Sequence, residues 1–347
     1  MEMKGLFSDI ILMVPEERGF MKIGSELLYL SRKEIGALDI GMAKTISLLE
    51  ESFWEKARGT VDALPKIELH PKRDDNFINA MLCSFPKYDA AGLKWISAYP
   101  GNKAKGLPYL SGLIVLNDPE TGIPLAILEA GILTAIRTGA VTGLSAKYLA
   151  RPDSQTVAIL GCGVQARTQL EAILAACPEV RLAKAYDVDA AAATRFARDM
   201  EDRFNVSVEQ TANPRVAVEG SDIIVTAGPI LANPNPVIEG SWLKEGCFGA
   251  PIDYDSYWRK SAFDAAARIY VDDVPQFESH RTMGYFGAVP PVCGDLADLV
   301  AGKISARQNG QERIIAINLG LSLEDIAVAA MVYRHALEQG LGQLLSI

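Results

Sequence analysis

The residue pattern most specific for chemistry in this chain is a short glycine-rich turn. Residues 156–166 read Thr-Val-Ala-Ile-Leu-Gly-Cys-Gly-Val-Gln-Ala, so Gly-x-Gly-x-x-Ala follows an apolar strand and opens a helix. Gly161 permits the tight turn, Gly163 lets the backbone approach a pyrophosphate, and the small Ala166 lets the helix pack closely on the strand. Free backbone N–H groups and the helix dipole then favour phosphate. The pattern therefore predicts a dinucleotide-binding turn.

A carboxylate follows the next predicted strand. Asp187 ends the apolar stretch 182–187, 26 residues after Gly161. An acid at this place can accept hydrogen bonds from the ribose hydroxyls of NAD and repels the 2′-phosphate of NADP. Residues 188–191 contain no arginine that could hold that phosphate, so we expect NAD. Two plainer interpretations are a similar domain that has lost its ligand and an ordinary acid at a strand end.

Three basic residues elsewhere stand among apolar neighbours. Lys94 shares a strand face with Ile96, Arg137 lies on the apolar stripe of a helix, and Lys66 begins a strand. A buried ammonium needs an anionic partner, and the planar fork of arginine suits a carboxylate. These cations are therefore candidates for holding a substrate carboxylate. Structural ion pairs, or a place at a sheet edge, explain the same pattern.

Acidic residues at two further places complete the candidate chemistry. Asp253 follows the apolar run 247–252 at the carboxyl end of a strand, where open parallel sheets place ligand groups. Many such acids only cap a loop, and that alternative stays open. Glu324 and Asp325 are expected to cap the last helix, because acidic residues favour a helix N-terminus.

The elements that must position these groups fall into two parts. The first contains short strands separated by turns, and its last helix ends at Arg151-Pro152-Asp153 because a residue before proline avoids the helical region. From residue 155, strands alternate with helices, which is typical of a parallel, doubly wound sheet. Residues 1–22 are expected to be an irregular lead-in. The expected helices are 40–57, 131–149, 166–176, 190–204, 213–219, 294–301 and 323–343, and the expected strands are 27–30, 66–69, 77–83, 92–98, 111–117, 124–129, 156–160, 182–187, 223–226, 247–251, 268–271 and 314–317.

Composition excludes several classes of protein. The net charge of -9 argues against a nucleic-acid or membrane-surface partner, since both need a basic surface. No apolar run is long enough to span a bilayer, and the N-terminus lacks the pattern of a signal peptide. The five cysteines form no C-x-x-C pair and the three histidines are scattered, so we expect no metal and a cytoplasmic location.

The motifs, taken together, resemble those of the ornithine cyclodeaminase/mu-crystallin family from about residue 26 onward. In chain order they are Gly92-Leu-Lys94-Trp, Pro100-Gly-Asn-x-x-Lys-Gly-Leu-Pro108, Leu116-Asn-Asp-Pro-Glu-Thr-Gly122, Arg137-Thr-Gly-Ala, Ala146-Lys-Tyr-Leu-Ala150-Arg, Gly161-Cys-Gly-Val-Gln165-Ala and Leu323-Glu-Asp325. The resemblance implies a Rossmann doubly wound parallel sheet inserted into an α+β domain that binds substrate and forms a homodimer. Residues 1–150 and 320–347 would form that substrate domain, and 151–319 the NAD-binding domain.

The resemblance also implies roles for single residues. Lys66, Lys94 and Arg137 match the cations that bind the substrate carboxylate, and Asp253 matches the acid that handles the substrate amine, so Asp253 and Lys94 are the catalytic candidates. Asn79 and Tyr109 are candidate substrate contacts. The implied cofactor contacts are Thr138, Gly161, Gly163, Val164, Gln165, Ala166, Asp187, Thr226 and Ala250.

Two positions depart from the family pattern. After Asp253 this chain reads Tyr254-Asp-Ser-Tyr257, where many members have Gly-Pro-Gly-Lys. Asn79 stands where cyclodeaminases have glutamate and alanine dehydrogenases have arginine. Both departures bear on which substrate the chain uses.

The expected function is hydride transfer to and from Cα of a small L-amino or imino acid. In a cyclodeaminase the hydride returns to the same substrate after ammonia leaves, whereas a dehydrogenase or ketimine reductase releases or consumes NADH. An alternative of another class is a non-catalytic NAD(P)H or small-ligand binder, as mu-crystallin is for thyroid hormone.

Overall fold

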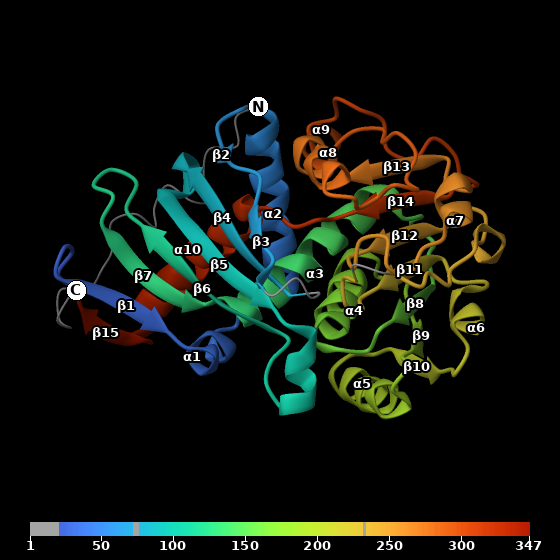
Figure 1. Cartoon of the computed structure of the whole chain (residues 1–347), viewed down its shortest axis with the longest axis horizontal. Coiled ribbons are helices and arrows are strands. Elements are labelled where there is room, and N and C mark those ends of the chain that lie inside the picture. Colours follow the sequence, from blue (N-terminus) through green and yellow to red (C-terminus); the bar gives the residue numbers. More distant parts are fainter. Residues whose placement is uncertain (1–20, 72–75, 232–233) are drawn as a thin grey trace.

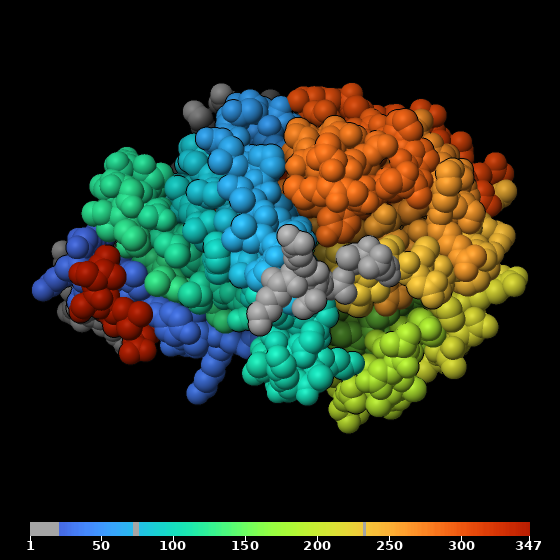
Figure 2. All heavy atoms as spheres, viewed as in Figure 1, coloured from blue at the N-terminus to red at the C-terminus, as the bar shows by residue number. Residues whose placement is uncertain are grey.

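The computed structural model describes residues 21–71, 76–231 and 234–347. Within these ranges the chain forms an eight-stranded sheet and a seven-stranded sheet that lie side by side, with helices between them (Figure 1). In the space-filling view, the blue-to-green part of the chain and the yellow-to-orange part meet along a seam (Figure 2). The expected irregular lead-in falls on residues 1–20, outside the described ranges, apart from its last two residues.

The eight-stranded sheet is antiparallel except for one pair. Its strand order is β15-β1-β7-β6-β5-β4-β2, β3 pairs with β4, and β1 runs parallel to β7. Its strands are β1 Glu26–Leu30, β2 Asp62–Ala63, β3 Ile67–Leu69, β4 Phe77–Phe85, β5 Ala90–Ala98, β6 Leu110–Asn117, β7 Pro124–Glu129 and β15 Gln343–Ser346.

Alternation along β4 and β5 gives this sheet one covered and one exposed face. Met81 and Lys94 are cross-strand partners on the covered face, and both are buried. Leu82 and Trp95 follow them in sequence, so their side chains point to the other face, where they are exposed. One face of the sheet therefore packs against the rest of the protein, and the other presents apolar side chains at the surface.

The seven-stranded sheet is entirely parallel, in the order β10-β9-β8-β11-β12-β14-β13. Most of its strands are continuous apolar runs because helices cover both faces. The chain leaves β8 in one direction and returns on its other side at β11, and ligands bind at such a reversal. The predicted doubly wound α/β fold is confirmed. Its strands are β8 Thr156–Leu160, β9 Leu182–Tyr186, β10 Ser207–Gln210, β11 Ile223–Thr226, β12 Phe248–Pro251, β13 Arg268–Val271 and β14 Ile314–Ile317.

Helices α2, α3 and α10 connect the sheets. Helix α10 packs on β4, β5 and β6, and α3 packs on α10, on α2 and on the first helix of the parallel sheet, α4. The Glu129 carboxylate caps α3 by accepting hydrogen bonds from two backbone amides of its first turn. The helices are α1 Arg32–Ala37, α2 Met42–Ala57, α3 Ala130–Leu149, α4 Val164–Ala176, α5 Ala190–Arg203, α6 Pro214–Val218, α7 Lys260–Asp264, α8 Val274–Thr282, α9 Leu296–Val300 and α10 Ser322–Gln339.

The C-terminus differs from the sequence prediction. The predicted helix over 323–343 is too long, because α10 ends at Gln339 and Gly340 takes a left-handed conformation with φ of 63°. Residues 343–346 instead form β15, which pairs antiparallel with β1. The chain thus returns to the eight-stranded sheet, in keeping with the predicted domain division, which stays a prediction.

Candidate active site

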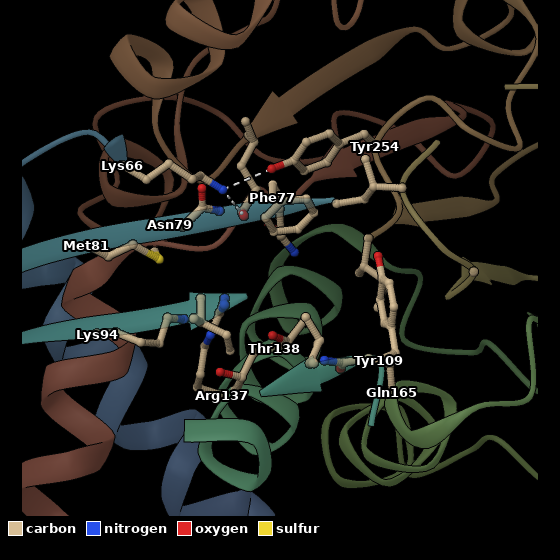
Figure 3. Close-up of a pocket in the computed structure, with 18 residues that line it drawn as sticks. Lys66, Phe77, Asn79, Met81, Lys94, Tyr109, Arg137, Thr138, Gln165 and Tyr254 are labelled. Atoms are coloured by element: carbon tan, nitrogen blue, oxygen red, sulfur yellow. Dashed lines mark hydrogen bonds between the residues drawn. The ribbon is translucent and has the colours of Figure 1, made fainter. Parts of the chain in front are cut away.

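A cavity of about 110 Å³ lies where the two sheets meet (Figure 3). Strands β4 and β5 and helix α3 form one side, and the loops that follow the carboxyl ends of β11, β12 and β14 form the other. This is the end of a parallel sheet at which ligands bind. The cavity is lined by Lys66, Phe77, Asn79, Met81, Lys94, Ile96, Tyr109, Leu110, Thr134, Arg137, Thr138, Gln165, Gly228, Ile230, Ile252, Tyr254, Asn318 and Leu319.

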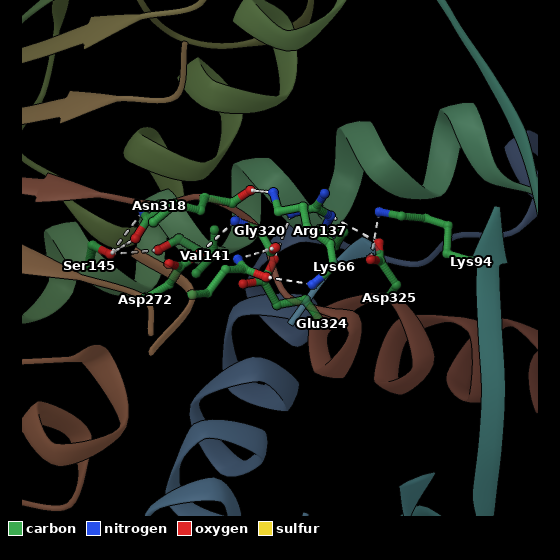
Figure 4. Close-up of polar contacts among 12 residues, drawn as sticks. Lys66, Lys94, Arg137, Val141, Ser145, Asp272, Asn318, Gly320, Glu324 and Asp325 are labelled. Atoms are coloured by element: carbon green, nitrogen blue, oxygen red, sulfur yellow. Dashed lines mark hydrogen bonds and ion pairs between the residues drawn. The ribbon is translucent and has the colours of Figure 1, made fainter. Parts of the chain in front are cut away.

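The structure brings the three predicted cations together. Lys66, Lys94 and Arg137 are all buried and all line this cavity, although they come from separate elements. Lys94 Nζ lies 2.6 Å from Asp325 Oδ2, so the expectation that this ammonium has an anionic partner is confirmed. Arg137 pairs with Glu324 at 2.7 Å and with Asp325 at 3.0 Å (Figure 4).

Glu324 and Asp325 lie in the first turn of α10, as expected of acidic residues, but neither caps the helix with a hydrogen bond. The cap position of α10 is Leu321, which makes no side-chain cap hydrogen bond. Both carboxylates are fully buried and face the cations instead. Burial of the Glu324 carboxyl raises its pKa, and the Arg137 guanidinium opposes that rise. The two acids are therefore counter-charges of the cavity wall.

Lys66 differs from the other two cations. Its ammonium donates hydrogen bonds to the hydroxyl of Tyr254 and to the carbonyl of Leu319, both at 2.9 Å. Among the described residues no carboxylate lies within ion-pair distance of it. Burial lowers the pKa of Lys66 to about 8, with Asp272 acting in the opposite direction. Burial, aided by the positive charge of Arg137, lowers the pKa of Lys94 to about 7.

Gly320 makes room for the arginine. It lies in the turn before α10 with φ of 86°, a conformation that favours glycine. A Cβ atom here would overlap the guanidinium nitrogens of Arg137. The Gly320 amide donates to Asp272 Oδ2 at 2.5 Å, which anchors the turn. Gly320 was not among the predicted site residues, because a single glycine next to Leu321 is not distinctive in the sequence.

The candidate substrate contacts Asn79 and Tyr109 also line the cavity. The amide oxygen of Asn79 is buried, and no described residue donates a hydrogen bond to it. Of the 18 lining residues, none is an aspartate or glutamate. The cavity thus offers cations and an amide to a ligand, but no lining carboxylate to a second ammonium.

Asp253, the predicted acid, does not line the cavity. Ile252 and Tyr254 line the cavity, whereas Asp253 between them, in the turn that follows β12, does not. Its fully buried carboxylate accepts hydrogen bonds from the Thr226 hydroxyl at 2.7 Å and the Gly228 amide at 2.9 Å. Burial raises the pKa of Asp253 to about 7. The structure therefore does not bring this carboxylate to the predicted catalytic position.

Two of the predicted cofactor contacts are likewise buried away from the cavity. The Thr226 hydroxyl donates to Asp253 and accepts a hydrogen bond from Trp258 Nε1 at 3.0 Å, so it serves the protein interior. Ala250 is fully buried within β12. Neither position was distinguishable by sequence from the cavity-lining residues nearby.

The glycine turn has the geometry that a pyrophosphate requires. Gly161 has φ of 90°, and a Cβ atom here would lie 2.8 Å from the carbonyl carbon of Ala227. Gly163 precedes α4, whose first turn has no side-chain cap, and the space in front of its Cα is open. Ala166 is fully buried, as close packing of the helix requires.

Asp187 stands directly beside this turn. Its carboxylate accepts hydrogen bonds from the Cys162 amide at 2.7 Å and the Asp189 amide at 2.8 Å. Each carboxylate oxygen keeps a second lone pair for a ribose hydroxyl. Val164 is exposed at the start of α4, and Gln165 and Thr138 extend from the turn region into the cavity. The residues present therefore fit a dinucleotide.

The sequence pattern of the ornithine cyclodeaminase/mu-crystallin family matches residues 27–340. The chain belongs to this family. The resemblance expected from the motifs is thus confirmed, and it extends over both sheets except for β15.

Named relatives in the ornithine cyclodeaminase/mu-crystallin family include dehydrogenases and reductases. The chain is 35% identical to an alanine dehydrogenase of Archaeoglobus fulgidus over 91% of this chain and 97% of the relative. It resembles the structure of a Δ1-pyrroline-2-carboxylate reductase of Thermococcus litoralis in complex with NADH and L-proline, with a TM-score of 0.83 and 31% identity over 91% of this chain and 99% of that one. An archaeal alanine dehydrogenase dimer with bound NAD has a TM-score of 0.82 and 32% identity over 92% of this chain and 99% of that one.

Proposed function

We propose that this protein is an NAD-dependent oxidoreductase that moves a hydride to or from Cα of a small L-amino or imino acid with an uncharged side chain. One observation carries the proposal: three buried cations line one cavity beside the glycine turn, and among the described residues the carboxylates that pair with them lie behind the lining and not in it. The named relatives act in the same class, as an alanine dehydrogenase and a pyrroline-carboxylate reductase.

The cavity also limits the size of the substrate. An apolar cavity of roughly 150 Å³ holds benzene. The cavity of about 110 Å³ found here is therefore on the scale of a molecule such as alanine or proline. A diamino acid would bring a second ammonium into a site already lined by Lys66, Lys94 and Arg137. Like charges repel, so we favour oxidation or imine reduction over cyclodeamination.

NAD is the proposed cofactor. The Gly161 turn and the open N-terminus of α4 would hold the pyrophosphate, and Asp187 would hold the adenosine ribose. When bound, NAD accepts the hydride and NADH donates it. Thr138, next to Arg137 on α3, and Gln165, in the first turn of α4, line the cavity and would contact the part of the dinucleotide that faces the substrate.

The cations would position the substrate for that transfer. Arg137 and Lys66 hold the carboxylate, which fixes Cα relative to the cofactor and makes positioning the main part of catalysis. Lys94, whose pKa is lowered to about 7, exchanges a proton with the substrate nitrogen and is supported by Asp325 at 2.6 Å. Phe77, Met81 and Ile252 are apolar parts of the lining and exclude water.

Asp253 takes a different role in this proposal from the one expected. By accepting hydrogen bonds from Thr226 and Gly228, it holds the loop after β11 against the loop after β12. It is then a positioning residue for the cavity wall, and the proton passes through Lys94 instead.

A panel of amino acids tests the proposed activity. The pure protein is incubated with NAD and alanine, proline, ornithine, lysine or diaminobutyrate, and NADH and ammonia are measured together. Pyrroline-2-carboxylate with NADH tests the reverse direction. We expect NADH from a neutral amino acid, or NADH consumption with the imine. Ammonia without NADH from a diamino acid would instead establish cyclodeamination, and no turnover in either direction would contradict the proposal.

We further propose a homodimer formed through the exposed face of the eight-stranded sheet. Leu82, Trp95 and Leu113 are each more than 40% exposed on that face, and Trp95 and Leu113 are cross-strand partners. An exposed apolar patch of this kind is typical of an interface, and the archaeal relative is a dimer.

Substitution of this face tests the dimer. Trp95→Glu should give a monomer in light scattering, because a charge at the centre of an apolar interface is left without a partner. Val216→Glu, which changes an exposed apolar residue on α6, is the matched control and should leave the dimer intact. A dimeric Trp95→Glu protein would place the interface elsewhere.

A cytoplasmic location stays a prediction, and no helix within the described ranges is long and apolar enough to cross a bilayer.

A further inference from the structure

Tyr254 has an unfavourable backbone conformation in the cavity wall. Its φ is 62°, a left-handed value that a bulky residue rarely adopts. Its side chain is nevertheless buried and lines the cavity. Residues held in such conformations cluster at ligand sites, where the surrounding structure compensates for the strain.

A cluster of rings fixes the Tyr254 side chain. Its ring centroid lies 5.6 Å from His280, 5.4 Å from Tyr285 and 5.1 Å from Phe286, and the first two contacts are edge-to-face. Phe286 also has a positive φ, of 58°, and its amide donates to Asp255 Oδ2 at 3.0 Å. The ring is thus held from several sides, and its hydroxyl has a defined place in the cavity.

The hydroxyl lies against the ammonium of Lys66 (Figure 3). Lys66 donates this hydrogen bond at 2.9 Å, so the tyrosine oxygen acts as the acceptor. A tyrosine hydroxyl has one proton to donate. Among the described residues no acceptor receives that proton. A donated bond from the cation also strengthens the hydroxyl as a donor, since hydrogen bonds in series polarise one another.

Lys66 has a donor left as well. An ammonium has three N–H groups. Two are used by Tyr254 and by the Leu319 carbonyl, and one remains. The pair Lys66–Tyr254 therefore presents two neighbouring donors to the cavity, which matches the two lone pairs of one carboxylate oxygen.

We infer that Tyr254 binds the substrate carboxylate directly, its hydroxyl donating a hydrogen bond to the oxygen that Lys66 also holds. This inference rests on the proposed function and adds a recognition residue to it. The segment 254–257 then supplies a contact with the reacting molecule, which gives the strained conformation of Tyr254 a role in binding.

Binding of a simple carboxylate tests the inference. Propionate is titrated into the NADH-loaded protein by calorimetry, and propionamide is the uncharged probe of the same shape. Tyr254→Phe keeps the ring and its contacts but removes the hydroxyl. Loss of a hydrogen bond to a charged group should weaken propionate binding roughly ten- to hundredfold. Propionamide, whose oxygen is an uncharged acceptor, should lose less affinity than propionate, and NADH should bind as in the unmodified protein.

Tyr270→Phe is the matched control, because it removes the hydroxyl of a buried tyrosine that does not line the cavity and that donates to the Ser305 carbonyl at 2.6 Å. It should leave propionate binding unchanged. In turnover, Tyr254→Phe should raise KM for the amino acid by about the same factor as the propionate Kd, with kcat within about threefold of the unmodified protein.

The outcomes separate the inference from the proposed function. If Tyr254→Phe binds propionate as tightly as the unmodified protein while NADH affinity is intact, the inference is wrong and the function stands. If Tyr270→Phe weakens propionate equally, the effect is not specific and the inference is wrong. If the unmodified protein binds neither NADH nor propionate, the proposed function itself fails.

Discussion

Asp325→Asn is the most informative perturbation of the ion cluster. One fully buried carboxylate lies 2.6 Å from Lys94 Nζ and 3.0 Å from Arg137 Nε, so it neutralises parts of two cations. Asparagine has nearly the same shape and no charge. Lys94 would then lose its one ion pair among the described residues, while its side chain stays about 1% exposed.

The size of the effect follows from burial. Removing one partner of a buried ion pair lowers the free energy of unfolding by about 3–5 kcal/mol. The unfolding entropy is about 2.1 cal/mol/K per residue, so for 347 residues unfolding as one unit this corresponds to a fall in Tm of roughly 4–7 °C. Thermal unfolding followed by circular dichroism measures it directly.

The pH dependence gives a second test of the same substitution. Burial lowers the pKa of Lys94 to about 7, below its unfolded value, and loss of Asp325 should lower it further. At low pH the charged Lys94 then destabilises the folded variant more than the folded unmodified protein. At high pH Lys94 is neutral in both folded proteins, so this contribution to the loss of stability disappears. The loss of stability should therefore be smaller at about pH 9 than at about pH 6.

Asp264→Asn is the matched control. Asp264 pairs with Lys260 at 2.6 Å, but the two side chains are 47% and 68% exposed. Such a pair contributes at most about 1 kcal/mol. If Asp325→Asn were as mild as Asp264→Asn, the cations would not depend on Asp325 and the described cluster would be wrong.

Three further predictions concern the cavity and the turn. Lys66→Met should weaken substrate binding by roughly ten- to hundredfold. It should leave Tm unchanged or higher, because it removes a buried ammonium that has no carboxylate partner among the described residues. A large fall in Tm would contradict this. Gly161→Ala should lower both Tm and NADH affinity, since φ at this residue is 90° and the space around its Cα is crowded. Gly163 has φ of -79° and open space in front of its Cα, so Gly163→Ala should keep the Tm and lose only NADH binding, as measured by fluorescence titration. In initial-rate measurements, the rate of amino-acid oxidation should rise with pH through about 7 as Lys94 deprotonates, and it should fall through about 8 as Lys66 loses its charge. Imine reduction needs both lysines protonated, so its rate should persist at lower pH. Identical pH profiles in the two directions would refute these roles.

The sequence predicts most elements because local patterns decide them. The strand at 156–160 and the helix at 131–149 are long apolar or amphipathic segments with clear ends, and they form within one or two residues of the expected bounds. The end of α10 was misplaced because the apolar residues continue past Gly340, whose left-handed conformation ends the helix. The pairing of β15 with β1 joins the two ends of the chain, and no local pattern encodes such a contact.

The same distinction holds for the candidate site: features set by local sequence were predicted, and features set by distant contacts were not. Lys94 and Arg137 were found because a charge among apolar neighbours is unusual, and the glycine turn was found because its spacing is specific. The place of Glu324 and Asp325 at a helix start was predicted, but their ion pairs were not, because the partner cations are far away in sequence. The direction of the Asp253 side chain depends on the turn after β12, where Tyr254 has φ of 62°, and sequence alone does not predict that conformation.

The central claim is that hydride moves between Cα of an amino acid and the nicotinamide. The most direct measurement uses the amino acid selected by the panel, carrying deuterium at Cα, with NAD. We expect the reduced cofactor to carry that deuterium, as measured by mass spectrometry, and the rate to show a primary isotope effect when hydride transfer limits it. Reduced cofactor without deuterium, or deuterium released to water, would contradict the account.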